Sequence, residues 1–582
     1  MKFGTFDIEA SNRSGMKLDL NIDFEVLGFF DGESYYKFLS VKKFLDSLDK
    51  KAYQGFRIFA HNGGKYDFLF LLEELWARGW VQKVIERTGR IIAIKIDTGR
   101  VSFTLADSFA LLPQSLRKLA ESFNVDHQKT EIDYKQVSAT DEKTLLYLEQ
   151  DVRCLYDVLN AFFSHELIDT PQLTIASQAL NTFRTKFQTA TTMQRVELPE
   201  EQMFRDMFYA GGRCEVYKGA GKVKVYDVNS LFPSVMLQKM PCGNVYPTKS
   251  YQKGRIGFYH VKIRHTPDWY ISPLLVKLKT GNFYVKGPGE YNVSSAMLEY
   301  LKKEFAVQFE VVSGWFFEGS DYLFNDYVTA LYKMKSSFPK SSAGYWIAKY
   351  LLNALYGKFG QSTWHDTLVN IERVKGDFKE PDSEILKNYG MVLVEERSRS
   401  KYIMPYLAAY ITDLARLKHF QLMQEAPHSM YYGDTDSLFT THNYDRYVSK
   451  AIGQLSFEGE YDGVFISPKC YALKKGKEEK VAFKGFSTEE FSFADFKRSA
   501  STMKPLTQKR QRMLSYRECL KRKAAVAYRA GRFLVLVDQK KKVEKRYDKR
   551  LTIPRKSGII FETEPLQYVH LSPNASQLLL FE

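Results

Sequence analysis

The sequence predicts a protein of several domains, some of them α/β and others α+β. The chain has 582 residues, too many for one hydrophobic core. Hydrophobic residues make up 44% and aromatic residues 15%, a composition typical of globular rather than disordered proteins. Strand-like and helix-like apolar patterns alternate in the N-terminal third, and a strand-rich stretch follows near the middle.

Residues 1–170 have the pattern of an α/β domain. The runs at 2–8 and 91–96 predict strands, and the amphipathic stretches at 68–78 and 141–163 predict helices. Strands that alternate with helices in this way favour a sheet covered by helices.

Four acids stand out in this first region. Asp7 and Glu9 are two residues apart on the first predicted strand, so their side chains share a face. Asp67 ends the segment HNGGKYD and Asp151 ends the segment YLEQD. A lone acid is usually a surface residue or a helix cap, but four acids taken together favour a shared site.

A fifth acid, Asp227, follows a second strand-like run at 223–226. A turn comes next, which places the carboxylate beside the backbone N–H groups of Ser230 and Leu231. Such groups can hold a triphosphate. We expect Phe232 to stand where the sugar of a nucleotide must lie.

Residues 349–360 are helical by pattern. Lys349, Asn353 and Tyr356 recur at i, i+4 and i+7, so they share one face. Such a stripe usually packs in a core. A lysine at its head is unusual for a core and suits contact with a phosphate.

The segment YYGDTDSLF, residues 431–439, reads as a tight hairpin that carries two acids. With strand alternation, Asp434 and Asp436 point to the same side. Ionised neighbours repel unless a cation lies between them, which is the requirement of Mg²⁺-assisted phosphoryl transfer. An acidic turn is the alternative, and the upstream Asp227 weighs against it.

The positive charge is concentrated near the C-terminus. The formal net charge is +16, and residues 497–556 alone hold 21 Lys and Arg against four acids. A solvated surface is the ordinary explanation of a charged run. A one-sided excess in a chain with metal-site patterns favours contact with a nucleic-acid backbone.

The cysteines are scattered, with no CxxC pair: Cys154, Cys214, Cys242, Cys470 and Cys519. This spacing argues against a zinc site and favours a reducing compartment. We expect no signal peptide and no transmembrane segment.

Six segments in order resemble the motifs of one known family. DVNSLFPS, KYLLNALYG and YGDTDS resemble the three polymerase motifs of family B DNA polymerases, and FDIEA, HNGGKYD and YLEQD resemble its proofreading exonuclease motifs. YAGG (209–212), ITDLAR (411–416) and SPKCY (467–471) are similar to the protein-primed branch of bacteriophages and linear plasmids.

The resemblance implies an RNase H-like exonuclease domain joined to a right-hand polymerase with two family-specific insertions. The implied parts are a 3′–5′ exonuclease (1–170), palm (171–245), an insertion contacting a priming protein (246–320), fingers (321–360), a second insertion for strand displacement and processivity (361–403), palm (404–480), and a basic thumb with the C-terminal tail (481–582).

At the polymerase site, the resemblance implies two Mg²⁺ (or Mn²⁺) ions held by Asp227, the main chain of Val228 and Asp436, with Asp434 supporting the geometry. The implied dNTP contacts are Ser230, Leu231, Phe232, Lys349, Asn353 and Tyr356, with Lys335 a weaker candidate. Phe232 replaces the usual tyrosine and Ala354 the usual serine, which bears on sugar selection.

At the exonuclease site, the resemblance implies two metal ions held by Asp7, Glu9 and Asp151, with Asp67 completing the carboxylates. Tyr147 would orient the attacking water, and Lys129 would contact the scissile phosphate.

The implied DNA contacts of the whole chain are Asn62, Ser108, Tyr209, Gly211, Gly212, Thr412, Arg416, Lys469 and Tyr471. Phe109 stands where leucine is usual.

The sequence therefore favours a DNA-directed DNA polymerase, protein-primed and with 3′–5′ proofreading, that replicates a linear viral or plasmid genome. We expect a monomer that binds DNA, dNTPs and a terminal protein, but no membrane, in the cytoplasm of a bacterial host. Two alternatives are an exonuclease whose polymerase half only binds DNA, and a DNA-binding protein without catalysis.

The C-terminal residues QLLLF, Gln577 to Phe581, resemble the short peptide that bacterial replication proteins insert into the sliding clamp. A glutamine followed by apolar residues on a mobile tail suits such a pocket. The third position is Leu rather than Ser or Asp. This favours slightly the alternative, in which the tail docks on the chain's own thumb.

Overall fold

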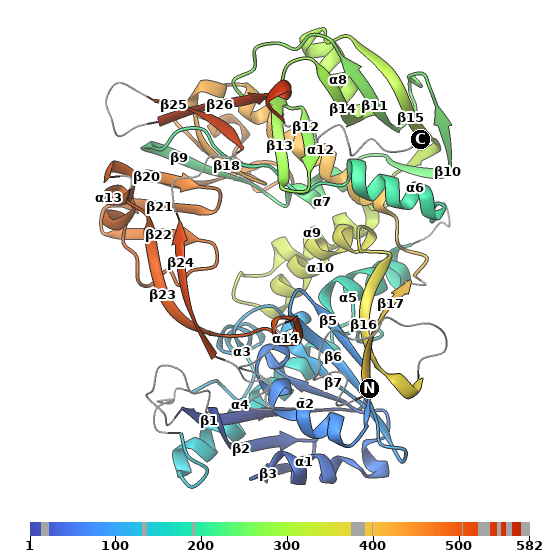
Figure 1. The fold of residues 1–582 in the computed structure, drawn as a ribbon, viewed down its shortest axis with the longest axis vertical. Helices are drawn as coiled ribbons and strands as arrows, with labels where there is room; N and C mark the ends of the chain where they lie inside the picture. Colours follow the sequence, from blue (N-terminus) through green and yellow to red (C-terminus); the bar gives the residue numbers. More distant parts are fainter. Residues whose placement is uncertain are drawn as a thin grey trace.

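The structure is a computed structural model, drawn in Figure 1. It describes residues 1–12, 22–130, 137–188, 193–373, 390–397, 400–502, 504–521, 536–543, 549–554 and 561–571. The Gln577–Phe581 peptide lies outside the described residues. Among the described helices, none is long and apolar enough to cross a bilayer.

The N-terminal region is built on a mixed sheet with strand order β17-β16-β5-β6-β7-β4-β1-β2-β3, seen at the bottom of Figure 1. Its first seven strands in sequence are β1 (Phe3–Asn12), β2 (Ile22–Phe30), β3 (Tyr35–Phe38), β4 (Arg57–Ala60), β5 (Val81–Arg87), β6 (Arg90–Asp97) and β7 (Ser102–Asp107). The helices are α1 (Val41–Leu48), α2 (Asp67–Ala77), α3 (Leu116–Phe123) and α4 (Glu142–Phe163).

The helix and strand predictions for this region are confirmed. Strands 2–8 and 91–96 correspond to β1 and β6, and helices 68–78 and 141–163 correspond to α2 and α4. Helix α4 begins where the Asp141 side chain accepts a hydrogen bond from the Thr144 N–H at 2.9 Å. Its apolar face packs on β1 and β2, where Leu148 and Val152 are fully buried.

The hairpin of β16 (Trp364–Asn370) and β17 (Met391–Arg397) extends this sheet. Strand β16 pairs antiparallel to β5, with Leu368 opposite Val84. Leu368 and Met391 are buried in the core of the N-terminal region. This hairpin falls in the predicted second insertion.

A second sheet has the strand order β22-β21-β20-β9-β19-β18-β8. Its strands are β8 (Cys214–Val216), β9 (Ala220–Val228), β18 (Met430–Asp434), β19 (Ser437–Thr440), β20 (Leu455–Ser467), β21 (Cys470–Lys475) and β22 (Glu478–Phe483). Helices α7 (Leu231–Met236) and α12 (Pro405–Gln424) pack against each other beside it. Most of these elements fall in the two segments predicted to form the palm.

A helical group lies between the two sheets in Figure 1. It contains α5 (Ile175–Thr182), α9 (Asn325–Ser337) and α10 (Ala343–Phe359), and α10 packs on both others. The Ser342 side chain accepts from the Tyr345 N–H at the start of α10. Helix α6 (Leu198–Met203) continues into a π-helical turn (Phe204–Phe208) just before YAGG.

The predicted first insertion forms two smaller sheets. One has the order β10-β15-β11-β14, with strands β10 (Met240–Thr248), β11 (Gly257–Ile263), β14 (Gly289–Ser294) and β15 (Phe309–Asp321), and helix α8 (Ser295–Phe305). The other has the order β12-β13-β26-β25, with strands β12 (Leu275–Leu278), β13 (Gly281–Lys286), β25 (Arg550–Pro554) and β26 (Phe561–Gln567). The C-terminal strands β25 and β26 thus pair with the insertion and contact the palm. They lie apart from the rest of the segment predicted to form the thumb.

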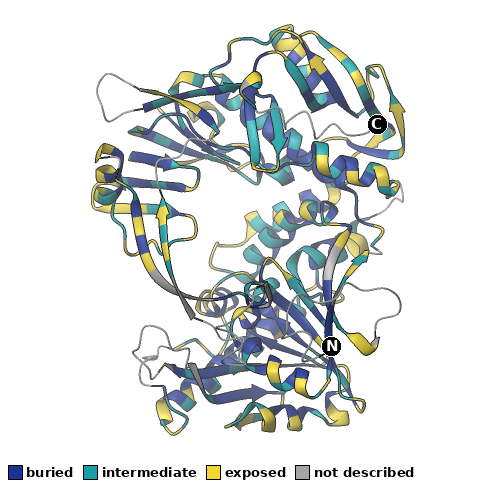
Figure 2. Ribbon diagram, in the orientation of Figure 1, coloured by how far each residue is buried: buried dark blue, intermediate teal, exposed yellow. Residues whose placement is uncertain are grey.

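The basic C-terminal segment extends from the palm to the N-terminal region. It consists of α13 (Phe493–Thr502), the paired strands β23 (Leu506–Met513) and β24 (Leu536–Val543), and α14 (Tyr516–Lys521). Leu506 is buried with palm residues, whereas Leu514, Tyr516 and Cys519 are buried in the core of the N-terminal region. Figure 2 shows the strands of the N-terminal sheet as buried along much of their length.

Candidate active sites

Strand pairing brings Asp227 and Asp436 together. β9 and β19 are antiparallel neighbours, with Asp227 opposite Ser437, and the Val228 N–H donates to the Asp436 carbonyl at 2.8 Å. Thr435 has φ of 61°, so the chain reverses tightly between Asp434 and Ser437. Asp436 lies in this turn, so strand alternation does not set its direction, contrary to the expectation from the sequence.

Asp434 faces a different partner. Both of its oxygens pair with the Lys469 ammonium, at 2.8 and 2.9 Å. It also accepts from the Tyr432 hydroxyl at 3.0 Å and from the Thr435 hydroxyl at 3.2 Å. Asp434 is therefore held by protein groups on both of its oxygens.

Burial and mutual repulsion disfavour the charged form of the other two acids. Burial, followed by the charge of Asp436, raises the pKa of Asp227 to about 7, against the opposing effect of Lys335 and Lys349. Burial raises the pKa of Asp436 to about 6, with a contribution from Asp434. Two half-buried carboxylates of this kind match the donor chemistry of a divalent hard cation.

The residues predicted to contact a nucleotide lie on elements around these acids. Ser230 caps α7 with φ of 52°, and its hydroxyl accepts from Lys335 at 2.9 Å. The ring of Phe232 stacks on Tyr356, with centroids 4.3 Å apart, which joins α7 to α10. Lys349 lies over the Trp346 ring at 4.6 Å, and Asn353 is exposed on the same helix.

The four N-terminal acids form a second cluster. The Ile8 N–H donates to Asp67 at 3.1 Å, which fixes α2 against β1. Burial, followed by Asp151, raises the pKa of Asp7 to about 7, and burial, followed by Asp7, raises the pKa of Glu9 to about 9. Burial also raises the pKa of Asp67 and Asp151. These acids line a cavity of about 580 Å³.

A lysine lies within this cluster. Lys129 forms an ion pair with Asp151 and donates to the Tyr147 hydroxyl at 2.7 Å. Its ammonium is also 4.8 Å from the centre of the Tyr147 ring. The structure therefore brings Lys129 to Asp151, although the two are 22 residues apart along the chain.

The two residues predicted to contact single-stranded DNA, Asn62 and Ser108, differ in their exposure. Asn62 is exposed, with φ of 66°, and lines the cavity. Ser108 is fully buried, and its hydroxyl contacts the Ala60 carbonyl at 3.2 Å and His61 Nδ1 at 3.0 Å. Its side chain therefore cannot touch DNA in this structure, because Ser108 lies behind His61.

Sequence reasoning singled out Phe109 but missed other residues of the cavity wall: His61, Tyr66, Ser115 and Leu116. Phe109 packs on His61 and under Arg90, whose guanidinium carbon is 4.5 Å from the ring centre. The paired glycines of HNGG are a sequence signal of close packing at this wall. A Cβ on Gly64 would meet the Ile91 carbonyl at 1.8 Å.

YAGG lies directly beside the hairpin that carries Asp434 and Asp436. The Thr435 N–H donates to the Arg213 carbonyl at 2.6 Å, and a Cβ on Gly212 would meet Thr435 at 2.6 Å. Gly211 faces open space. Only glycine at position 212 lets the segment approach the hairpin so closely.

Two of the predicted DNA contacts are buried side chains of α12. Thr412 is 1% exposed and donates to the Ala409 carbonyl at 3.0 Å. Arg416 is 6% exposed and donates to the Ala210 carbonyl at 2.6 Å. Neither side chain reaches the surface. Arg416 holds the backbone of YAGG, whereas Thr412 is bonded within its own helix. Lys469 stays half-exposed, and Tyr471 packs on Tyr432.

Both carboxylate clusters have the donors that a metal ion requires, but the described side chains are not already gathered round one point. In the described ranges, no group of three or more His, Cys, Asp or Glu residues is arranged to hold an ion. Lys129 and Lys469 neutralise one acid at each site instead. The carboxylate donors are those that Mg²⁺ or Mn²⁺ prefers.

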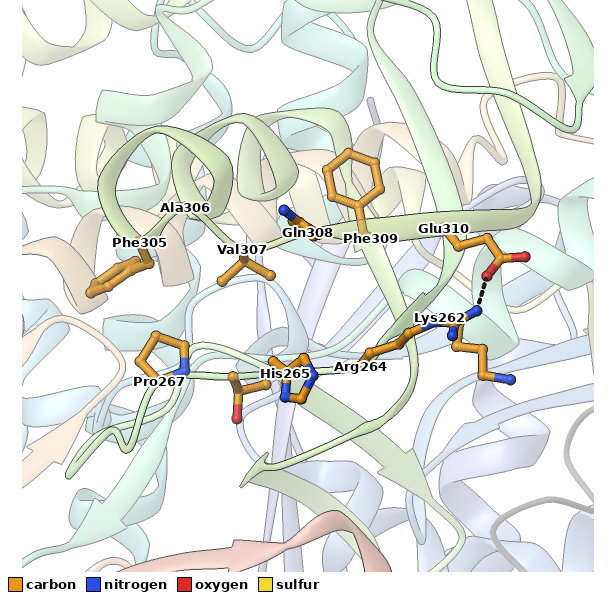
Figure 3. Close-up of a pocket in the computed structure, with 11 residues that line it drawn as sticks. Lys262, Arg264, His265, Pro267, Phe305, Ala306, Val307, Gln308, Phe309 and Glu310 are labelled. Carbon is orange, nitrogen blue, oxygen red and sulfur yellow. Dashed lines mark hydrogen bonds and ion pairs between the residues drawn. The ribbon is translucent and has the colours of Figure 1, made fainter.

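A cavity of about 660 Å³ lies elsewhere, in the predicted first insertion (Figure 3). The segment Lys262–Pro267 forms one wall, and Phe305–Glu310 forms the facing wall. Arg264 pairs with Glu310 at 3.3 Å. This cavity contains none of the clustered carboxylates, so it is separate from both sites.

Comparison with known sequences identifies one family. The family described as DNA polymerase type B, organellar and viral, matches residues 49–143 and 139–392. A probable DNA polymerase of Neurospora intermedia is 27% identical over 537 residues, covering 76% of this chain and 54% of the relative. The chain thus spans about half the length of that relative. The DNA polymerase of Bacillus phage phi29 is 24% identical, covering 65% and 70%.

A solved structure has the same fold. The structure described as phi29 DNA polymerase complexed with primer-template DNA and incoming nucleotide substrates has a TM-score of 0.74. The match covers 93% of this chain and all of that one, at 18% identity. At this identity the likeness establishes the arrangement of the chain and leaves its chemistry to the residues.

Proposed function

The chain belongs to the type B DNA polymerases of the organellar and viral group, and on that premise we propose that it is a DNA-directed DNA polymerase with a 3′–5′ proofreading exonuclease. The observation that carries the proposal is the pairing of β9 with β19, which sets Asp227 beside Asp436. Lys335 and Lys349 lie near enough to Asp227 to lower its pKa against burial.

At the polymerase site, the protein's own groups would bind and orient the nucleotide. Lys335 and Lys349 would neutralise the triphosphate, and the first N–H groups of α7 are free of intrahelical acceptors. The Phe232–Tyr356 stack would present a flat apolar surface to the sugar and base. Asp227, Asp436 and the Val228 carbonyl would hold two Mg²⁺ or Mn²⁺ ions, which activate the 3′-hydroxyl and stabilise the leaving pyrophosphate.

At the exonuclease site, Asp7, Glu9 and Asp151 would hold the metal ions, with Asp67 anchoring β1. Tyr147 would orient water, and Lys129 would contact the scissile phosphate once Asp151 turns toward a metal. The cavity between β1 and α3 would receive the single-stranded 3′ end, with Asn62 and Phe109 on its wall. Aromatic side chains commonly stack on unpaired bases.

Protein priming and replication of a linear viral or plasmid genome are supported by similarity alone. A DNA-directed DNA polymerase of Enterobacteria phage PRD1 is 32% identical over 215 residues, covering 36% of this chain and 35% of that relative. We propose a terminal protein as partner. Initiation would be tested with a candidate terminal protein, linear template and one labelled dNTP, and formation of a labelled protein is the expected result.

The main test is a primer-extension gel with and without dNTPs. The polymerase hypothesis requires longer products with dNTPs and shortened primers without them. Shortening under both conditions would leave only the nuclease alternative, and an unchanged primer that still shifts in a binding gel would leave only a DNA-binding protein.

A further inference from the structure

The backbone carbonyls of YAGG are held by cationic side chains from two sides. Lys277 donates to the Tyr209 carbonyl at 2.9 Å. Arg416 donates to the carbonyls of Ala210 at 2.6 Å and Gly211 at 3.2 Å. Three consecutive carbonyls are thus fixed by two long side chains from different elements.

Lys277 comes from β12, a strand of the first insertion. Its ammonium also donates to the Arg205 carbonyl at 2.8 Å, near the end of the π-helical turn. A cation there suits the negative end of a helix. Lys277 forms no ion pair with a carboxylate in the part of the chain that the structure describes, so its strongest described contacts are these two carbonyls.

Arg416 is secured in a different way. It pairs with Asp413 at 2.8 Å, and Asp413 in turn accepts from Ser294 of the first insertion. Lys277 and Arg416 line the same small cavity, of about 20 Å³, between the insertion and α12. Burial, with a contribution from the nearby Arg416 charge, lowers the pKa of Lys277.

The Tyr209 ring links the Lys277 contact to the elements of the polymerase site. It packs on Gly360, where a Cβ would lie 2.6 Å from the ring. Burial, followed by neighbouring Tyr209 and Asp436, raises the pKa of Tyr356 to about 12. Tyr356 then stacks on Phe232. Tyr209 thus joins β12 to the C-terminal end of α10, the helix that carries Tyr356.

We propose that Lys277 is a positioning residue for the primer strand, which ties the YAGG segment to the first insertion. The inference rests on the proposed function, since it assigns YAGG to the primer path. It also predicts that a displacement of the β12–β13 hairpin would alter the primer path and leave the exonuclease cavity unchanged.

Lys277 is a better test position than Arg416. Replacing Arg416 would leave the largely buried Asp413 without its positively charged partner, which destabilises the fold. Lys277→Met keeps the apolar stem and removes only the ammonium. Lys279 offers a matched control, because it lies on the same hairpin and is exposed.

The experiment compares wild type, Lys277→Met, Lys277→Arg and Lys279→Met. We expect Lys277→Met to raise the KM for primer-template about tenfold, since two charged hydrogen bonds are lost, with little change in kcat. Degradation of single strands should stay at the wild-type rate. Lys277→Arg should restore part of the KM, because a guanidinium can also bridge two carbonyls.

Two results would overturn the inference. One is a Lys277→Met variant that matches Lys279→Met in its KM for primer-template. The other is a parallel loss of single-strand degradation and extension, which would indicate a general loss of folding. If wild type extends no primer at all, the proposed function fails instead, so the two failures are distinguishable.

Discussion

Asp434 and Asp436 are two residues apart, yet their surroundings differ. Asp434 is neutralised by Lys469, whereas Asp436 faces Asp227 across β9 and β19. The difference arises because Thr435 takes a left-handed conformation and turns the chain between them. One acid of the pair is thus neutralised by a lysine, and the other lies beside a second carboxylate.

The Lys469–Asp434 pair can be tested directly. Lys469→Met should lower the rate of nucleotide addition about tenfold, because Asp434 loses a charge-assisted partner and repels Asp436. The rate is measured in single-turnover extension. Lys474→Met is the control, since Lys474 of β21 pairs with Glu479 on the neighbouring strand β22. Equal rates in the two variants would contradict a special role for Lys469.

His419 contacts the hairpin that carries Asp434 and Asp436. Its burial predicts that the stability of the protein depends on pH. Its Nε2 contacts the Ser437 carbonyl at 3.1 Å, and burial lowers its pKa to about 4. Arg213, Asp434 and Glu215 are the charged groups that act on it. Because the unfolded chain takes up a proton near pH 6.5 and the folded chain does not, stability falls as pH drops from about 6.5 to 4.

We therefore expect wild type to lose more stability than His419→Gln between pH 7 and pH 5, by about 2 kcal/mol. Urea unfolding at both pH values measures the difference. His442→Gln serves as the control, because His442 is partly exposed. A His419→Gln variant with the same loss as wild type would show that His419 is protonated in the folded protein.

At the scale of elements, α14 joins the basic hairpin to the N-terminal core. Ser515 and Glu518 form a capping box: Ser515 N–H and hydroxyl donate to the Glu518 carboxylate, at 3.0 and 2.8 Å. Tyr516 is 3% exposed and packs on Trp76. The helix therefore anchors the far end of β23 and β24.

Tyr516→Ala should lower the free energy of unfolding by about 3–5 kcal/mol, as expected for loss of a buried aromatic side chain. The unfolding midpoint, followed by calorimetry, is the measurement. Tyr322→Ala is the matched control because Tyr322 is 52% exposed, and its effect should be within about 0.5 kcal/mol. A small effect at both positions would mean that α14 is not docked in solution.

At the scale of the whole molecule, two carboxylate clusters lie on separate sheets. Asp227→Ala or Asp436→Ala should abolish nucleotide addition and leave single-strand degradation intact. The double variant Asp7→Ala, Glu9→Ala should do the reverse. Loss of a metal ligand removes several kcal/mol of transition-state stabilisation. Near-normal extension by Asp436→Ala would show that the site is wrongly assigned.

Metal removal should affect both clusters together. We expect EDTA to stop extension and degradation, and Mg²⁺ or Mn²⁺ to restore both, because neighbouring carboxylates in each cluster repel one another unless a cation neutralises them. Both reactions are followed on one labelled primer across a metal titration. Activity that persists after exhaustive chelation would contradict the proposed metal chemistry.

The sequence alone was sufficient for what depends on neighbouring residues. Asp7 and Glu9 share a strand face, and Lys349 and Tyr356 share a helix face, because backbone periodicity sets side-chain direction within one element. The order of the acid-bearing segments along the chain also indicated two separate sites. These features need no information about which element packs on which.

Only the tertiary structure showed which side chains are buried by segments that are distant in the sequence. Ser108, Thr412 and Arg416 have polar side chains, and only packing shows that they are buried behind the surfaces they were expected to form. The contact of Lys277 with Tyr209 joins residues 68 apart, and the pairing of β16 with β5 joins two predicted domains. Periodicity determines which residues share a face, whereas the partner of that face follows from how the whole chain buries its apolar surface.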